Sequence, residues 1–386
     1  MKKVLATVLA LVMALALCTT SWADATGVTC DGTNCDHAAE FNGKHYAHLT
    51  DAYAALTRGG AAPAEAEVIT LLKNSAGGGI GADADKNMNY VIDFAGHTYT
   101  VGKPAVGSTG TVTQGLRVMQ TSTATFKNGT LKAADYNQLK QVVHTYGDVT
   151  LDNFTVDATE DSYAQVAVEP DCGTLNIIGN SSILAREGMT GLYVAFWHTG
   201  TYDGTTANVN TTGKITGKLV YEFDERKTGA DAATENKGVL NIENGNFEIA
   251  EIETIFTESL ADELKVPKIS VSGGTYTVDV SKYIATDKIV QKDGGAYKVV
   301  ADGAITSGTY TSQPTVPSGY KATKNDDGTW TVTKISYYYY PSTSDTTTST
   351  TTKGSPKTFD AGVGIYAVTA VLSVTGMAWA AKKRGN

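Results

Sequence analysis

A repeated strand–corner–strand unit in the middle of the chain constrains the fold more than any other feature. Each unit has an apolar anchor, a polar residue before it and another apolar residue before that. The anchors are Phe94, Phe126, Leu151, Ile177, Val209, Ile242 and Val271. The apolar residues two positions earlier are Ile92, Ala124, Val149, Leu175, Ala207, Leu240 and Ile269. This period of two predicts strands with one buried face.

A tight corner and a second short strand follow the anchors. Most corners hold Gly or Asn, as at Asn128-Gly129 and Gly273-Gly274, and these residues tolerate left-handed backbone angles. The anchors recur every 25 to 33 residues. One such unit cannot close a core, but stacked units bury a continuous apolar column. The repeat therefore predicts a solenoid over residues 67–280, with both apolar positions of each unit pointing inward.

This pattern resembles the right-handed parallel β-helix of the pectate-lyase-like superfamily. A Greek-key sandwich would also supply strands, but not the same unit seven times. The resemblance implies an all-β, right-handed parallel β-helix. Residues 24–66 precede it as an N-terminal cap with a short helix over 48–56, for which Thr50 or Asp51 is the expected N-cap. Residues 281–335 predict a module of two β-hairpins, turning at Asp293-Gly294 and Asp327-Gly328.

The N-terminal residues predict export. Lys2 and Lys3 precede a mostly apolar run from Val4 to Leu17, and small residues then allow cleavage after Ala23. This order is typical of a secretory signal peptide over residues 1–23. A lipoprotein signal with Cys18 as the lipidated residue is the alternative, and it also places the chain outside the membrane.

The C-terminal residues predict attachment to the cell. Residues 336–354 are rich in Tyr, Ser and Thr and predict a disordered tether. An uncharged stretch of 21 residues, 361–381, is long enough to cross a bilayer as a transmembrane helix. Basic residues 382–384 follow it and mark the cytoplasmic side.

Just before that stretch, Ser355-Pro356-Lys357-Thr358-Phe359 resembles the LPxTG-like sorting signal of Gram-positive wall-anchored proteins. The resemblance covers the last 32 residues, 355–386. It implies that a sortase cleaves after Thr358 and joins the chain to a cell-wall precursor. Phe359 stands where the family usually has Gly. Without cleavage, the helix would hold the chain in the cytoplasmic membrane, so the expected location is the extracellular face in either case.

The charge of the displayed part excludes one class of partner. Residues 24–358 hold 26 basic and 39 acidic side chains. Such a surface repels polyanions, so nucleic acid is not an expected partner.

Two cysteines near the mature N-terminus allow three interpretations. Cys30 and Cys35 predict a disulfide, because export favours oxidation. Free thiols are the second reading. The third is zinc binding with His37, His45 and His48, although the spacing matches no zinc finger. We expect no metal and no cofactor.

Few side chains suggest chemistry. Glu222, Asp224, Glu225 and Arg226 crowd one segment, but no Asp-His or paired-Arg motif accompanies them, so we assign no catalytic residue and expect no enzyme. Tyr193, Trp197 and Tyr202 are candidate ligand contacts, since aromatic rings stack on sugars, but they also suit core packing. We expect an adhesin or binding protein for a host protein or glycan. A carbohydrate-active enzyme and a structural surface component are the alternatives.

Overall fold

The computed structural model describes residues 28–29, 35–82, 84–108, 110–199, 202–227 and 229–336. The predicted signal peptide, Cys30, the tether beyond Ser336, the sorting signal and the apolar segment 361–381 lie outside these residues. The described part is mostly β-structure, and all of its named strands join one long sheet. No helix in this part is long and apolar enough to cross a membrane.

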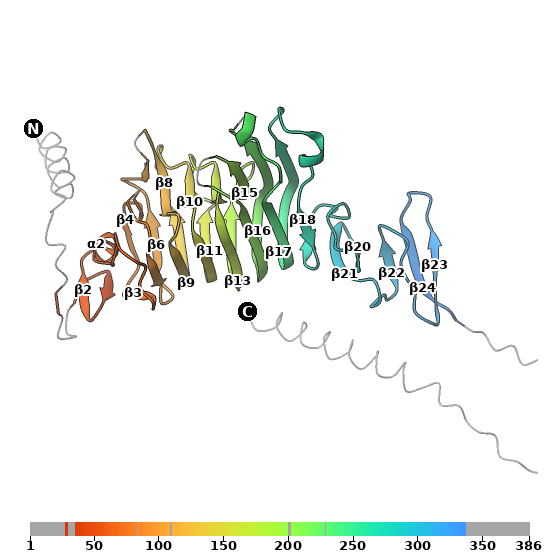
Figure 1. The fold of residues 1–386 in the computed structure, drawn as a ribbon. Helices are drawn as coiled ribbons and strands as arrows, with labels where there is room; N and C mark the ends of the chain where they lie inside the picture. Colours follow the sequence, from red (N-terminus) through yellow and green to blue (C-terminus); the bar gives the residue numbers. More distant parts are fainter. Residues whose placement is uncertain are drawn as a thin grey trace, which may run out of the picture. The chain divides into compact units, whose positions relative to one another are not determined.

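A first parallel ladder contains the strands that the repeat predicts (Figure 1). Its members are β3 (Glu67–Leu71), β5 (Asn89–Asp93), β9 (Thr123–Ala133), β11 (Asp148–Ala158), β13 (Gly173–Gly179), β16 (Thr205–Glu225), β17 (Gly238–Phe256) and β18 (Ile269–Val271). Each strand pairs with the equivalent strand of the next unit, as stacked repeats require.

A second parallel ladder follows the corners. It contains β4 (Ser75–Gly77), β6 (Thr98–Val101), the second parts of β9 and β11, β14 (Ser182–Ala185), parts of β16 and β17, and β19 (Thr275–Tyr276). At these corners, the predicted left-handed residues are confirmed, with φ of 56° at Asn128 and 97° at Gly274.

A third parallel ladder carries the candidate site. It contains β8 (Thr111–Val118), β10 (Gln141–Thr145), β12 (Val166–Pro170), β15 (Thr190–His198) and the last parts of β16 and β17. The short strand β7 (Val106–Ser108) pairs antiparallel with β8.

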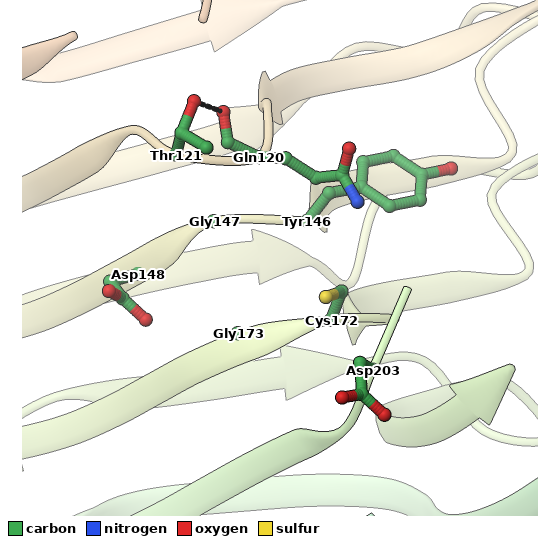
Figure 2. Close-up of a pocket in the computed structure, with 8 residues that line it drawn as sticks. All are labelled: Gln120, Thr121, Tyr146, Gly147, Asp148, Cys172, Gly173 and Asp203. Carbon is green, nitrogen blue, oxygen red and sulfur yellow. Dashed lines mark hydrogen bonds between the residues drawn. The ribbon is translucent and has the colours of Figure 1, made fainter. Parts of the chain in front are cut away.

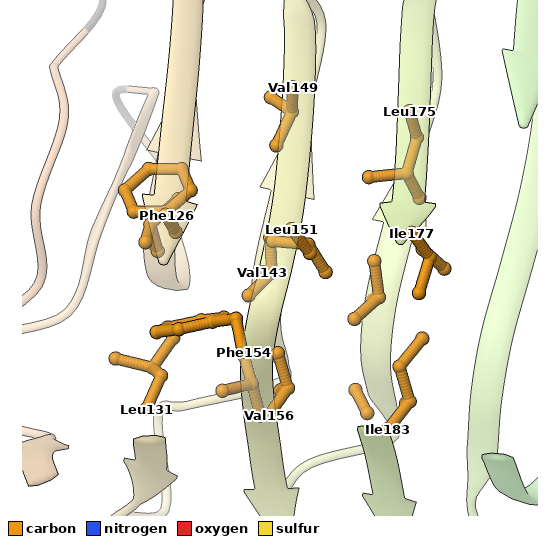
Figure 3. Close-up of a cluster of buried hydrophobic side chains, with 14 of the residues drawn as sticks. Phe126, Leu131, Val143, Val149, Leu151, Phe154, Val156, Leu175, Ile177 and Ile183 are labelled. Carbon is orange, nitrogen blue, oxygen red and sulfur yellow. The ribbon is translucent and has the colours of Figure 1, made fainter. Parts of the chain in front are cut away.

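One apolar core runs between the ladders, and Figure 3 shows its middle section. The predicted inward alternation is confirmed: all seven anchors are buried, and so are the earlier apolar residues except Ile269, which is half-buried. The predicted register is confirmed from Phe126 onward. It is wrong by two residues at the first unit, where Ile92, and not Phe94, lies opposite Phe126.

The N-terminal part contains β1 (Ala39–Phe41), β2 (Lys44–Tyr46) and the helix α2 (Leu49–Ala54). The expected N-cap is wrong, because Leu49 is buried against the core and starts the helix one residue before Thr50. His48 is the N-cap, and its side chain makes no capping hydrogen bond.

Both predicted hairpins are confirmed, as β20 (Lys288–Asp293) with β21 (Ala296–Ala301) and β23 (Tyr320–Lys324) with β24 (Trp330–Lys334). A strand that we did not predict, β22 (Gly308–Tyr310), joins them. Two short 3₁₀ helices, η1 (Gly229–Asp231) and η2 (Asp262–Leu264), complete the described elements.

Candidate functional site

A row of polar side chains lies on the third ladder. The strand register places Arg117 beside His144 and His144 beside Glu169. Core residues flank each of them, for example Leu116 and Val118 around Arg117. Since side chains alternate along a strand, the three polar side chains point away from the core. They are nevertheless only 2% to 5% exposed. Buried polar groups of this kind need partners.

His144 forms the centre of the row. Its Nε2 lies 2.5 Å from Oδ2 of Asp171, and its Nδ1 lies 2.5 Å from the side-chain amide of Gln114. Asp171 follows Glu169 by two residues and is fully buried. The nearest aromatic ring is Tyr146, whose centroid is 4.6 Å from that of the imidazole. We call His144, Glu169 and Asp171 the buried triad.

Burial opposes charge on every member of this triad. It lowers the pKa of His144 to about 4. Burial, followed by the nearby Asp171 carboxylate, raises the pKa of Glu169 to about 8. Burial, together with the negative charge of Glu222, raises the pKa of Asp171 well above its usual range. The short contact between His144 and Asp171 therefore lies where burial disfavours the charged form of both groups.

Arg117 is held beside the triad by two other groups. Its Nη2 donates to Oγ of Ser108 at 2.9 Å, and its guanidinium lies 5.4 Å from the Tyr146 ring centroid. Arg117 thus keeps a positive charge close to His144 and contributes to its lowered pKa.

Tyr193 and Trp197 come together at the edge of this row. The Tyr193 hydroxyl donates to Oε2 of Glu222 at 2.5 Å, and Nε1 of Trp197 donates to the same oxygen at 3.4 Å. All three side chains are half-buried, so solvent reaches them. The guanidinium of Arg226 lies 4.0 Å from the Trp197 ring centroid and covers one face of the indole. We call Tyr193, Trp197 and Glu222 the aromatic edge.

Tyr202, the third predicted contact, lies at a different place. Its ring stacks on Tyr146, with centroids 5.1 Å apart and planes inclined by 22°. Tyr146 in turn lines a pocket of about 460 Å³, which Figure 2 shows. The other lining residues are Gln120, Thr121, Gly147, Asp148, Cys172, Gly173 and Asp203. Tyr146 therefore links this pocket to the buried triad.

A second depression, of about 710 Å³, lies on the second ladder. Its lining side chains are mostly short and polar, and none is aromatic. Because ligand sites combine apolar surface with a few polar groups, the pocket beside Tyr146 is the stronger candidate.

Two of the three histidines that the sequence placed near the cysteines contact Cys35, and the third, His48, is instead the N-cap of α2. Sγ of Cys35 lies 2.8 Å from Nδ1 of both His37 and His45. Cys35 is disulfide-bonded. Cys30 lies outside the described residues, so the Cys30–Cys35 pairing stays a prediction.

Sequence reasoning missed the buried triad and assigned no role to Glu222. A usable signal was present, because Arg117, His144 and Glu169 are 27 and 25 residues apart, which is the spacing of the repeat. No protein-family model, curated protein or solved structure matches this chain. Function is therefore inferred from the site itself.

Proposed function

We propose that this chain is displayed on the extracellular face of the cell, is held there by its C-terminus, and binds a glycan. Export is supported by the signal-like residues 1–23. Attachment is supported by the uncharged stretch 361–381 and the basic residues after it. The sorting-like residues 355–359 support a sortase and a cell-wall precursor as partners.

The proposed scaffold for this display is a right-handed parallel β-helix over residues 67–280. Three parallel ladders with matching strand order support it, since the central units of the chain contribute one segment to each ladder in turn. Such a scaffold holds side chains from separate units about 5 Å apart in fixed rows. It therefore suits recognition of an extended ligand.

The observation that carries glycan binding is the convergence of Tyr193 and Trp197 on one carboxylate oxygen of Glu222. Aromatic rings pack against the C–H faces of sugars, and a carboxylate accepts hydrogen bonds from sugar hydroxyls. The pocket beside Tyr146 adds two more carboxylates, Asp148 and Asp203. Asp203 pairs with Lys237, but residues 24–358 hold 39 acidic and 26 basic side chains, and this net negative charge favours neutral or amine-bearing sugars over polyanionic ones.

Glycan binding is tested on an array of neutral, amine-bearing and acidic glycans with the full chain. Trp197→Ala is expected to weaken binding of the best ligand about tenfold, which is roughly 1.4 kcal/mol. Tyr163→Ala is the matched control, because Tyr163 is an aromatic residue 42% exposed elsewhere on the surface. Equal loss in both variants, or binding to a protein but to no glycan, would contradict the proposal.

A carbohydrate-active enzyme is the second candidate. It is favoured by the closeness of Glu169, Asp171 and Glu222, whose charges act on one another. Two carboxyl groups at a defined separation carry out glycoside hydrolysis. This candidate predicts release of reducing ends from a glycan that the chain binds, and at least a hundredfold loss of rate, on the order of a missing general acid or base, in Glu222→Gln.

The control for that assay is Glu251→Gln, which changes an exposed glutamate that pairs with Lys218. Reducing ends should appear at the wild-type rate with this variant. If the wild-type chain releases none from any bound glycan, the enzymatic candidate is rejected and the binding function stands.

A further inference from the structure

The buried triad also has the composition of a metal site. We propose that His144, Glu169 and Asp171 bind one divalent first-row transition-metal ion, such as Zn²⁺ or Mn²⁺. One imidazole nitrogen and one oxygen from each carboxyl group all lie within 4.8 Å of one another. Ligand atoms bound to one ion at about 2.1 Å in a tetrahedral site are about 3.4 Å apart. The longest separation among the three atoms therefore needs to shorten by at most about 1.4 Å.

A second observation points independently to a ligand. Asp171 is fully buried, and its Oδ1 has no hydrogen-bond partner among the residues that the structure describes. The other oxygen of the same carboxyl group contacts His144. An unpaired buried carboxylate oxygen is costly, and a bound cation would satisfy it.

Gln114 can orient the imidazole for this purpose. Its side-chain amide faces Nδ1 of His144 at 2.5 Å, and its Oε1 has no partner in the described part of the chain. Flipping the side-chain amide of Gln114 places its Oε1 against Nδ1 of His144. Nδ1 then donates a hydrogen bond to Oε1. The lone pair of Nε2 is left for a metal. A second group that fixes the imidazole in this way usually accompanies a metal-binding histidine.

The local charges suit a divalent cation. Two carboxylates would balance its charge, and the half-buried Glu222 adds a third negative group nearby. Arg117 and Arg226 are the cations that act on the triad. Arg117 is engaged by Ser108, and Arg226 by Asp224. An imidazole ligand favours transition metals over Mg²⁺ and Ca²⁺, which prefer oxygen.

An ion can approach through the pocket beside Tyr146. Cys172, which directly follows Asp171, lines this pocket, as does Tyr146, which contacts His144. None of the three proposed ligands belongs to the aromatic edge, so metal binding can be tested separately from glycan binding.

The test uses the full chain, stripped with a chelator and then dialysed against Zn²⁺ or Mn²⁺, with Mg²⁺ and Ca²⁺ for comparison. Elemental analysis is expected to find one transition-metal ion per chain at the triad. Binding should weaken at least tenfold in His144→Gln and in Asp171→Asn. Circular dichroism checks that each variant folds. Failure to bind any of the four ions would overturn the proposal, and so would equal binding of Mg²⁺.

The group of Cys35, His37 and His45 becomes a competing site where the Cys35 disulfide is reduced, because its ligand atoms are also within 4.8 Å of one another. His45→Gln is therefore the matched control and should keep the ion at the triad. X-ray absorption of the zinc-loaded wild type distinguishes the two sites without any variant. If the bound ion has only nitrogen and oxygen neighbours, the result supports binding at the triad. Sulfur among the neighbours, or loss of all binding in His45→Gln, would assign the ion to the N-terminal group and reject the proposal.

Discussion

Leu175→Asp is expected to lower the free energy of unfolding by about 3 to 5 kcal/mol, because it buries an unpaired charge. Leu175 is fully buried on β13 and lies between Val149 of β11 and Ala207 of β16. No water reaches this position to solvate a carboxylate. The measurement is urea denaturation of the full chain, followed by circular dichroism.

The matched control is Ile178→Asp on the same strand. Ile178 is 37% exposed, so its carboxylate would remain solvated. We expect a change within about 1 kcal/mol, as at most surface positions. Comparable losses at both positions would show that β13 does not have one buried and one solvated face. An unaffected Leu175→Asp variant would contradict the burial of the whole apolar column.

The register could be predicted from the sequence over most of the first ladder but not at its start. A shift of two residues keeps every side chain on the same face, so the apolar alternation cannot detect it. Ile92 and Phe94 are both apolar and both buried. The structure shows which contacts distinguish the position of Phe94 from that of Ile92. A Cβ on Gly129 would lie 2.3 Å from Cβ of Phe94, and the Phe94 ring packs against Phe154 at 4.6 Å between centroids.

Gly129 therefore leaves the space through which the Phe94 ring reaches Phe154. The lack of a side chain at Gly129 on β9 is explained only by the neighbouring strand β5. From the sequence alone, we interpret the same glycine as part of a corner. The turn chemistry was correctly predicted, but this packing role depends on a neighbour 35 residues away in the chain.

The candidate site was only half predictable for a related reason. Tyr193 and Trp197 are close in sequence, so a local concentration of aromatic residues identified them. His144 lies on β10, Glu169 lies on β12, and Asp171 directly follows β12, so His144 meets Asp171 only because β10 pairs with β12. In sequence, His144 is 25 residues from Glu169 and no local pattern joins them. Extending the repeat to its third strand would have aligned Arg117, His144 and Glu169.

A chain that ends at Gly354 is expected to leave the cells and appear in the medium, whereas the full chain stays with the cells. The shortened chain lacks residues 355–386 and with them the whole uncharged stretch. We expect that stretch to partition into the bilayer, because its side chains are mostly apolar and a helix would satisfy its own backbone. We expect the basic residues 382–384 to resist crossing and to stop translocation. Cell fractionation and immunoblotting measure the distribution, and retention of the shortened chain on cells would refute C-terminal anchoring.

Covalent sorting is a separate step, and Thr358→Ala isolates it. If residues 355–359 are a sorting signal, a sortase would form its acyl intermediate on the Thr358 carbonyl, so the wild type should be linked to the cell wall and the variant held in the membrane. A proline disfavours helical geometry at the residue before it, so Pro356 is expected to favour an extended Ser355, which suits binding in a groove. Thr352→Ala in the tether is the matched control and should sort normally. Phe359→Gly restores the usual residue after the scissile bond and should increase the wall-linked fraction. If wild type, Thr358→Ala and Phe359→Gly all fractionate with membranes, residues 355–359 are not a sorting signal and the apolar segment alone is the anchor.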